Sequence, residues 1–120
     1  MAVRGFRGAV QVEADEPGLV LAATSELVTA VMERNGLSDD DLISMVFTAT
    51  PDLTCQFPAA AARGLGLVDV PLLCAAEIPV PGAMPRVVRL LAHAETALTR
   101  AEVRHVYLGA TVALRDDLPR

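Results

Sequence analysis

The sequence predicts an α/β fold, a mixed sheet of about five strands with helices packed on one side. Short apolar runs of strand length alternate along the chain with segments of helical periodicity. Proline, glycine and asparagine stand at the ends of most of these segments. The length of 120 residues predicts a single domain over residues 1–120. Hydrophobic residues make up 52%, more than one small core can bury, so we expect an oligomer.

The first half of the chain is predicted to form two strands around a long helix. Residues 3–13 partly alternate apolar and polar side chains, and two glycines there leave room for a close approach of backbone or ligand. Asp15-Glu16-Pro17 is typical of a helix start, and Asn35-Gly36 is typical of a helix end. Residues 42–50 form an almost wholly apolar run, which predicts a strand buried on both faces.

The second half is predicted to continue the alternation. In order, we expect a short helix at 58–63, a strand at 68–80, a helix starting at Pro85, and strands at 103–108 and 111–114, before a polar tail that frays. The helix after Pro85 would turn Val87, Leu90, Leu91 and Ala94 inward and would place Arg86, Arg89 and His93 on one other face.

Composition and charge exclude several function classes. The net charge is −5, which argues against a general nucleic-acid surface. All ten basic residues are arginine, so any anion site must use guanidinium groups, which suit carboxylates. No run is long enough to span a bilayer, and the N-terminus lacks the features of a signal peptide. Cys55 and Cys74 form neither a disulfide framework nor a metal motif, so we expect no metal and reduced thiols. Together with the lack of a bilayer-spanning run, this predicts a soluble cytoplasmic protein that does not bind a membrane.

One acidic side chain, Glu77, interrupts the apolar strand predicted around residues 71–78. A buried carboxylate needs a partner because it loses its hydration, and Arg86 and Arg89 are the nearest cations downstream. Glu77 could equally serve as a structural partner of Arg86, and Cys74, three residues earlier, could be a core side chain. These residues mark the part of the sequence that looks suited to chemistry.

The chain resembles a known family, the monofunctional chorismate mutases of the trimeric α/β-barrel type found in Bacillus. The resemblance covers nearly the whole chain. The matching blocks are Arg4-Gly5-Phe6-Arg7-Gly8-Ala9, Ala49-Thr50-Pro51-Asp52-Leu53, Phe57-Pro58-Ala59, Cys74 with Glu77, Arg89, Arg104-His105-Val106-Tyr107-Leu108, and Leu114-Arg115. Each block alone is a weak signal, and their order and spacing together are strong.

The resemblance implies a homotrimer whose active sites lie between neighbouring subunits and convert chorismate to prephenate without a cofactor. It implies that Arg89 meets the ether oxygen, that Arg7 holds a substrate carboxylate supported by Tyr107, and that Glu77 accepts hydrogen bonds from the ring hydroxyl and from the Cys74 thiol. The site walls would come from Phe57, Ala59, Leu73 and Leu114, and Arg63 and Arg115 would close the mouth. Ala60 departs from the family, which often carries a basic residue there.

Two other function classes stay open. Small trimeric hydrolases of the imine-deaminase type also place an arginine at a subunit seam, but they need a positioned water and have no obvious use for Cys74, Glu77 and Arg89 in this order. A non-catalytic oligomer that binds a small acid would keep Arg7 and would tolerate loss of Arg89. His93 and His105 lack an acid or nucleophile at a telling spacing, so we assign both to structure.

Overall fold

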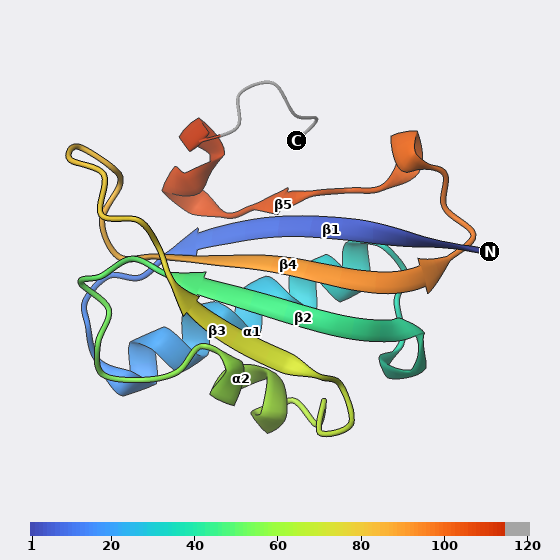
Figure 1. The fold of residues 1–120 in the computed structure, drawn as a ribbon, viewed down its shortest axis with the longest axis horizontal. Coiled ribbons are helices and arrows are strands. Elements are labelled where there is room, and N and C mark those ends of the chain that lie inside the picture. Colours follow the sequence, from blue (N-terminus) through green and yellow to red (C-terminus); the bar gives the residue numbers. More distant parts are fainter. Residues whose placement is uncertain (115–120) are drawn as a thin grey trace.

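The computed structural model describes residues 1–114 and contains one five-stranded mixed sheet, which confirms the predicted fold class (Figure 1). The strands cross the sheet in the order β3-β2-β4-β1-β5. β4 runs antiparallel to β1 and β2, whereas the edge strands β5 and β3 run parallel to β1 and β2. The elements are β1 (Ala2–Gln11), α1 (Pro17–Arg34), β2 (Leu42–Ala49), α2 (Ala59–Gly64), β3 (Leu72–Ala76), β4 (Val87–Thr96) and β5 (Val106–Tyr107), with 3-10 helices at Asp39–Asp41, Arg100–Glu102 and Gly109–Leu114.

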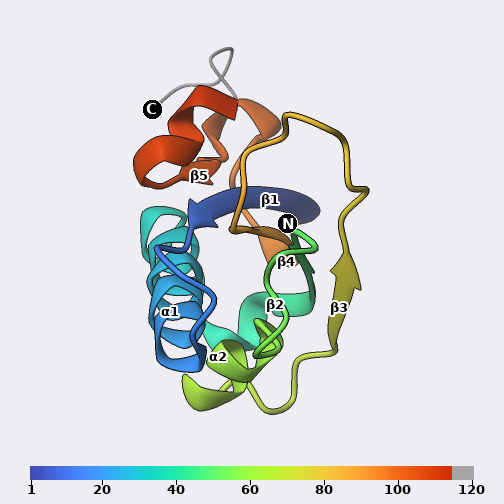
Figure 2. The same cartoon turned by 90° about the vertical axis from the view of Figure 1, so that its left-hand side faces the viewer.

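Helices α1 and α2 pack on one face of the sheet, as predicted (Figure 2). α1 begins with Pro17 and is followed by Asn35 and Gly36, whose φ of 62° lies in the left-handed region that ends many helices. Leu27 of α1 points toward the sheet and packs in the same hydrophobic core as Phe6 of β1. Complete burial of such a side chain stabilises the fold by about 1.5–3 kcal/mol.

The segment after Pro85 is a strand, and the predicted helix is wrong. β4 occupies the centre of the sheet, and its side chains alternate between the core and the opposite face. Leu90 and Ala92 are buried, whereas Leu91 between them is 38% exposed. The helical prediction failed because Leu91 is as apolar as its buried neighbours, and this disguised a period of two as a helical pattern.

Three other strand predictions need correction. The strands predicted at 68–80 and 103–108 are confined to β3 and β5, and residues 111–114 belong to a 3-10 helix. The Thr111 hydroxyl donates to the carbonyl groups of Ala9 and Leu108, 3.0 and 2.6 Å away, and such local bonds favour a turn over strand pairing. The predicted frayed tail falls on residues 115–120, outside the described part of the chain.

Among residues 1–114, the face of the sheet opposite α1 and α2 leaves apolar side chains exposed. β2 buries Met45 and Phe47 but leaves Val46 partly exposed, so it is not buried on both faces as predicted. The strand register aligns Leu91, Val46 and Leu73 across β4, β2 and β3, and Leu73 is 61% exposed. Exposed apolar side chains in such a row are typical of an interaction surface. None of the helices within residues 1–114 is long and apolar enough to cross a membrane.

Candidate active site

Glu77 fixes the orientation of Arg89 on the open face of the sheet. The Nε of Arg89 donates to Oε1 of Glu77 at 3.2 Å, and the Thr48 hydroxyl donates to Oε2 at 2.8 Å. The side chain of Glu77 is only 18% exposed and that of Arg89 is 41% exposed. Both carboxylate oxygens therefore have partners, and the alternative pairing of Glu77 with Arg86 is wrong.

Arg86 has a separate, structural role at the entry to β4. Its backbone N–H donates to both carboxylate oxygens of Asp52 at 3.1 and 3.0 Å, and its Nε donates to the Val12 carbonyl at 2.9 Å. Its φ of 52° is unusual for a residue with a side chain and costs backbone energy. These bonds hold the left-handed turn that leads into the strand carrying Arg89.

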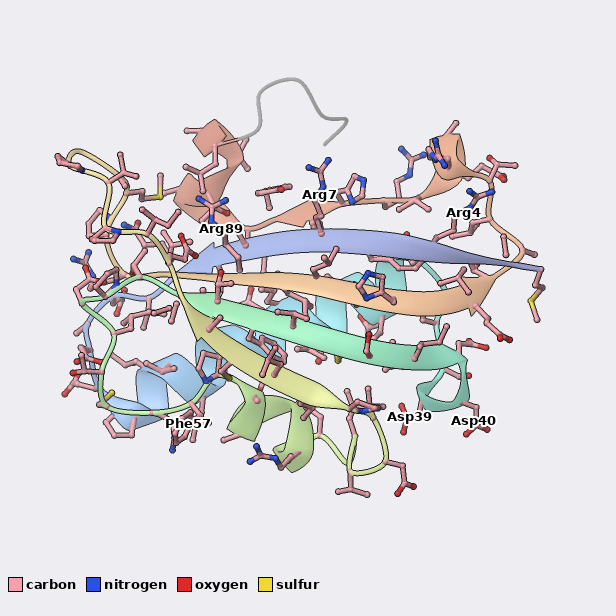
Figure 3. All side chains as sticks on the ribbon, in the orientation of Figure 1. Arg4, Arg7, Asp39, Asp40, Phe57 and Arg89 are labelled. Carbon is pink, nitrogen blue, oxygen red and sulfur yellow. The ribbon has the colours of Figure 1, made fainter. Side chains whose placement is uncertain are left out.

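Arg7, Arg89 and Tyr107 line one open hollow of about 310 Å³ on the face opposite the helices. The side chains of Arg7 and Arg89 are labelled in Figure 3. The register pairs Ala9 of β1 with Arg89 on one side and with Tyr107 on the other. Because alanine is small, the two long side chains can extend above it. Arg7 lies two residues earlier on the same face of β1, so three strands deliver the three side chains to one place.

The charges around this hollow favour an anion. Arg7 and Arg89 supply two positive charges, and Glu77 supplies one negative charge. Within residues 1–114, the side chain of Arg89 makes hydrogen bonds only through Nε, and the guanidinium group of Arg7 makes none. The terminal amino groups of both side chains are thus available to a ligand. A guanidinium fork that is already oriented matches a carboxylate bidentately.

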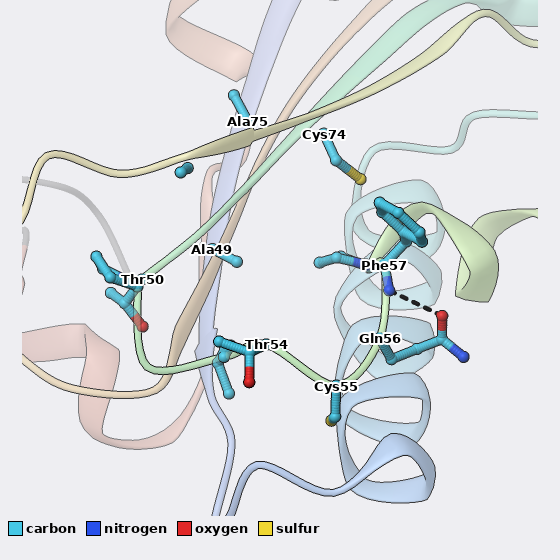
Figure 4. Close-up of a pocket in the computed structure, with 12 residues that line it drawn as sticks. Ala49, Thr50, Thr54, Cys55, Gln56, Phe57, Cys74 and Ala75 are labelled. Carbon is cyan, nitrogen blue, oxygen red and sulfur yellow. Dashed lines mark hydrogen bonds between the residues drawn. The ribbon is translucent and has the colours of Figure 1, made fainter.

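A second, larger hollow of about 540 Å³ lies at the other edge of the sheet (Figure 4). Phe57, which is 68% exposed, lines it together with Cys74 of β3 and Cys55. The pKa of the Cys55 thiol is raised, chiefly by its hydrogen bond with Asp15. The same bond lowers the pKa of Asp15. The predicted wall residue Phe57 and the predicted contact Cys74 therefore share a site that is separate from the arginines.

The predicted hydrogen bond between Cys74 and Glu77 is not made within one chain. The register pairs Cys74 with the buried Phe47, on the core side of the sheet, and pairs its neighbour Ala75 with Thr48 on the open side. Glu77 shares the parity of Ala75 and reaches Thr48, so it lies on the opposite face from the thiol. The prediction failed because two side chains that are three positions apart on a strand point to opposite faces of the sheet.

The other predicted wall and mouth residues are dispersed. Ala59 is 2% exposed, so in the single chain it belongs to the core of α2 rather than to a wall. Arg63 is exposed at the end of α2, Leu73 is exposed on β3, and Leu114 is half-buried in the last 3-10 helix. Arg115 lies outside the described residues. A single chain therefore unites Arg7, Glu77, Arg89 and Tyr107. The hollow that the two arginines line includes none of Phe57, Ala59, Arg63 and Leu73.

Sequence reasoning missed two contributors to this geometry. The Thr48 hydroxyl donates to the second carboxylate oxygen of Glu77. Its only signal in the sequence is that it is a polar side chain within a mostly apolar run. His105 accepts a hydrogen bond from the backbone N–H of Arg7 at 3.0 Å, although it lies 98 residues away in sequence. Among residues 1–114, no group of three or more His, Cys, Asp or Glu side chains is arranged to hold a metal ion.

Comparison with known proteins gives one consistent family. The family model for chorismate mutase type I matches residues 3–118. A chorismate mutase AroH of Thermus thermophilus is 51% identical over 97% of this chain and 96% of its own length, and that of Bacillus subtilis is 39% identical over 98% and 94%. A chorismate mutase structure from Clostridium thermocellum superposes with a TM-score of 0.90 at 37% identity, covering 92% of this chain and 98% of that one. The chain therefore belongs to the type I chorismate mutase family.

Proposed function

We propose that this chain is an isomerase that rearranges chorismate to prephenate, a step in the synthesis of phenylalanine and tyrosine. The observation that carries the proposal is the geometry around Arg89. Glu77 holds this side chain through Nε, and Arg89 lines the same hollow as Arg7 and Tyr107. This arrangement fits a substrate with carboxylates in which partial negative charge builds on another atom, the ether oxygen, in the transition state.

The rearrangement breaks a carbon–oxygen bond and forms a carbon–carbon bond in one concerted step. It therefore asks the protein for no nucleophile, metal or cofactor, but it does require a compact conformation of a flexible substrate. Arg7 binds one carboxylate and Tyr107 supports it, so the substrate is held in a bent shape. Correct orientation of reacting groups can contribute up to about 7–11 kcal/mol to catalysis.

Arg89 supplies the electrostatic part of the mechanism. As the carbon–oxygen bond breaks, negative charge accumulates on the ether oxygen, and a guanidinium group aimed at that atom stabilises the transition state. Arg89 needs little reorganisation, because Glu77 already fixes it at 3.2 Å and Thr48 fixes Glu77 at 2.8 Å. Glu77 has the further role of accepting a hydrogen bond from the ring hydroxyl of the substrate.

The complete site lies between neighbouring copies in a homotrimer. Arg7 and Tyr107 belong to the β1–β5 side of the sheet, whereas Phe57 and Leu73 belong to the β3 side. Head-to-tail contact between two different sides of identical chains closes into a ring when the rotation permits, and three copies make such a ring. The ring would cover the apolar open face and bring the walls formed by one chain, including Arg63, to the arginines of the next.

The natural setting of the proposed reaction is the cytoplasm, with chorismate as a free small molecule. Cys55 and Cys74 are both free thiols in the structure, in keeping with a reducing compartment. Neither nucleic acid nor membrane has a place in this mechanism. The net charge of −5 agrees with this view, because it disfavours non-specific binding to anionic polymers.

The direct experiment is to add chorismate to the purified protein and to follow the loss of its absorbance, with prephenate identified as the product. We expect saturable turnover that chelators leave unchanged. The rate should vary little between about pH 6 and 9, because arginine stays charged throughout this range. Failure to convert chorismate would refute the proposal, and a steep bell-shaped pH profile would favour acid–base hydrolysis of the imine-deaminase kind.

A further inference from the structure

The chain segment that leads into β5 is bonded to β1 through a side chain. The backbone N–H of Arg7 donates to Nδ1 of His105 at 3.0 Å, and the bond is partly buried. Since the donor is an amide, Nδ1 must be the unprotonated ring nitrogen, and a neutral imidazole then carries its proton on Nε2. His105 was assigned to structure from the sequence, yet it accepts a hydrogen bond from a residue of the candidate site.

A side chain takes this role because the ladder between β1 and β5 ends there. The two strands pair only at Gly8 with Val106 and at Ala9 with Tyr107. Arg7 is the next residue of β1 beyond this short ladder, and the imidazole nitrogen supplies the acceptor that a longer strand would supply with a carbonyl. A partly buried N–H left without any acceptor would be unfavourable.

His105 stands on a fixed support. Its neighbour Arg104 is held at both backbone groups by Asn35, which accepts from the Arg104 N–H and donates to its carbonyl, each at 2.8 Å. On its other side, Val106 is completely buried. Both residues that flank His105 are therefore held, so the imidazole has little freedom to follow Arg7 if that residue shifts.

The neighbouring glycine brings the two segments into contact. A Cβ atom added to Gly8 would lie 2.8 Å from the Val106 carbonyl oxygen, so only glycine allows β1 and β5 to approach this closely. This approach carries the backbone of Arg7 to the imidazole of His105 and places Tyr107 beside Ala9.

We propose that His105 is a positioning residue for substrate binding, because it fixes the backbone of Arg7 and thereby the direction of the Arg7 guanidinium group. The inference rests on the proposed function, in which that group binds a carboxylate of the substrate. A carboxylate is present both before and during the reaction. Loss of the positioning bond should therefore weaken ground-state and transition-state binding alike, and it should appear in KM rather than in kcat.

Three substitutions separate the acceptor from the bulk of the side chain. His105→Asn places an amide oxygen on the γ carbon, where Nδ1 is attached in histidine, so it can restore the bond. His105→Gln carries its oxygen one carbon further out, and His105→Leu carries no acceptor. We expect the Leu and Gln variants to raise KM for chorismate about threefold to tenfold with kcat within about twofold of the parent, and the Asn variant to stay near the parent in both.

Two further measurements separate positioning from stability. A merely structural role would lower the folded fraction and hence the maximal rate, but the KM of the remaining enzyme would not change. Exchange of the Arg7 amide with solvent, measured by NMR without substrate, should be slow in the parent and in the Asn variant and faster in the other two. Sedimentation should give each variant the same mass as the parent.

The possible results distinguish failure of the positioning role from failure of the proposed function. An active parent together with an unchanged KM in His105→Leu and His105→Gln would overturn the positioning role alone. If His105→Leu fails to fold, equal KM values for the Asn and Gln variants would overturn it. A parent that does not convert chorismate would overturn the proposed function and this role with it.

Discussion

The close approach of β1 and β5 at the candidate site depends on Gly8, and adding one methyl group there perturbs it directly. In Gly8→Ala the new Cβ would lie 2.8 Å from both the Val106 carbonyl oxygen and Cδ1 of Leu27, and 3.3 Å from Cγ2 of Val31. The Val106 oxygen belongs to the backbone and cannot turn aside. The Leu27 side chain can rotate, so β5 is the element that must move away from β1.

The expected cost follows from these contacts. Overpacking by one methyl group typically destabilises a core by about 1–3 kcal/mol, whereas replacing glycine restricts the unfolded chain and returns about 0.4–1 kcal/mol. We expect a net loss of about 1–2 kcal/mol in the free energy of unfolding, which is a fall of roughly 0.5–1 M in the urea midpoint. KM should also rise, because displacement of β5 moves Tyr107 and His105 away from β1.

The control is Gly18→Ala in the first turn of α1, where nothing lies within 4 Å of the added Cβ. This variant should be neutral or more stable by up to about 1 kcal/mol, because alanine favours the helix. Both variants should be unfolded at the same protein concentration, since assembly adds to apparent stability. A Gly8→Ala protein as stable as the control, with the KM of the parent, would refute the argument that this glycine sets the spacing between β1 and β5.

Three further predictions test separate parts of the account. Thr24→Val should raise the free energy of unfolding by about 1–2 kcal/mol in urea titrations, because the buried Thr24 hydroxyl has no hydrogen-bond partner within residues 1–114. A variant less stable than the parent would contradict this expectation. Arg89→Ala should lower kcat about 10²–10³-fold with a smaller change in KM, whereas Arg7→Ala should chiefly raise KM. A trimeric Arg89→Ala variant with a kcat within tenfold of the parent would disprove the electrostatic role of Arg89. Asp15→Asn should speed alkylation of Cys55 at pH 8, because Asp15 raises the pKa of that thiol and so lowers its thiolate fraction. The alkylation rate at Cys74 serves as the control, and an unchanged rate at Cys55 would contradict the assignment.

The sequence was most informative where local rules and tertiary packing agree. The long helix ends where Asn35 and Gly36 predicted, because both residues satisfy the last turn: Asn35 donates to the Val31 carbonyl at 2.9 Å and Gly36 takes a positive φ. The fold class followed from the alternation of segments. The charged set of Arg7, Glu77 and Arg89 was selected from the sequence, and the structure unites all three residues with Tyr107.

The errors have two physical sources. The first is a sheet with one uncovered apolar face, which makes Leu91 look like a core residue and turned β4 into a predicted helix. The second is that contacts far apart in sequence leave no periodic signal. The bond from Arg7 to His105 spans 98 residues, and the bond from Thr48 to Glu77 spans 29. The opposite directions of Cys74 and Glu77 were predictable from strand parity alone.

The central claim is that one chain supplies the arginines and a neighbouring chain supplies the walls. Two inactive variants test it: Arg89→Ala removes the electrostatic half of the site, and Phe57→Asp places a carboxylate in the wall, where it repels an anionic substrate. If sites form at the seams of a trimer, a mixed trimer contains some seams that join the intact half of each variant. Random exchange of equal amounts makes about a quarter of all seams intact.

The decisive measurement is therefore the chorismate mutase activity of the two variants after they are unfolded together, mixed in equal amounts and refolded. Each variant refolded alone, and the two mixed without unfolding, are the controls. We expect the refolded mixture to recover about a quarter of the parental activity while the controls stay near zero. Activity of the refolded mixture no higher than the average of the separate variants, in particles shown to contain both, would contradict a site shared between chains.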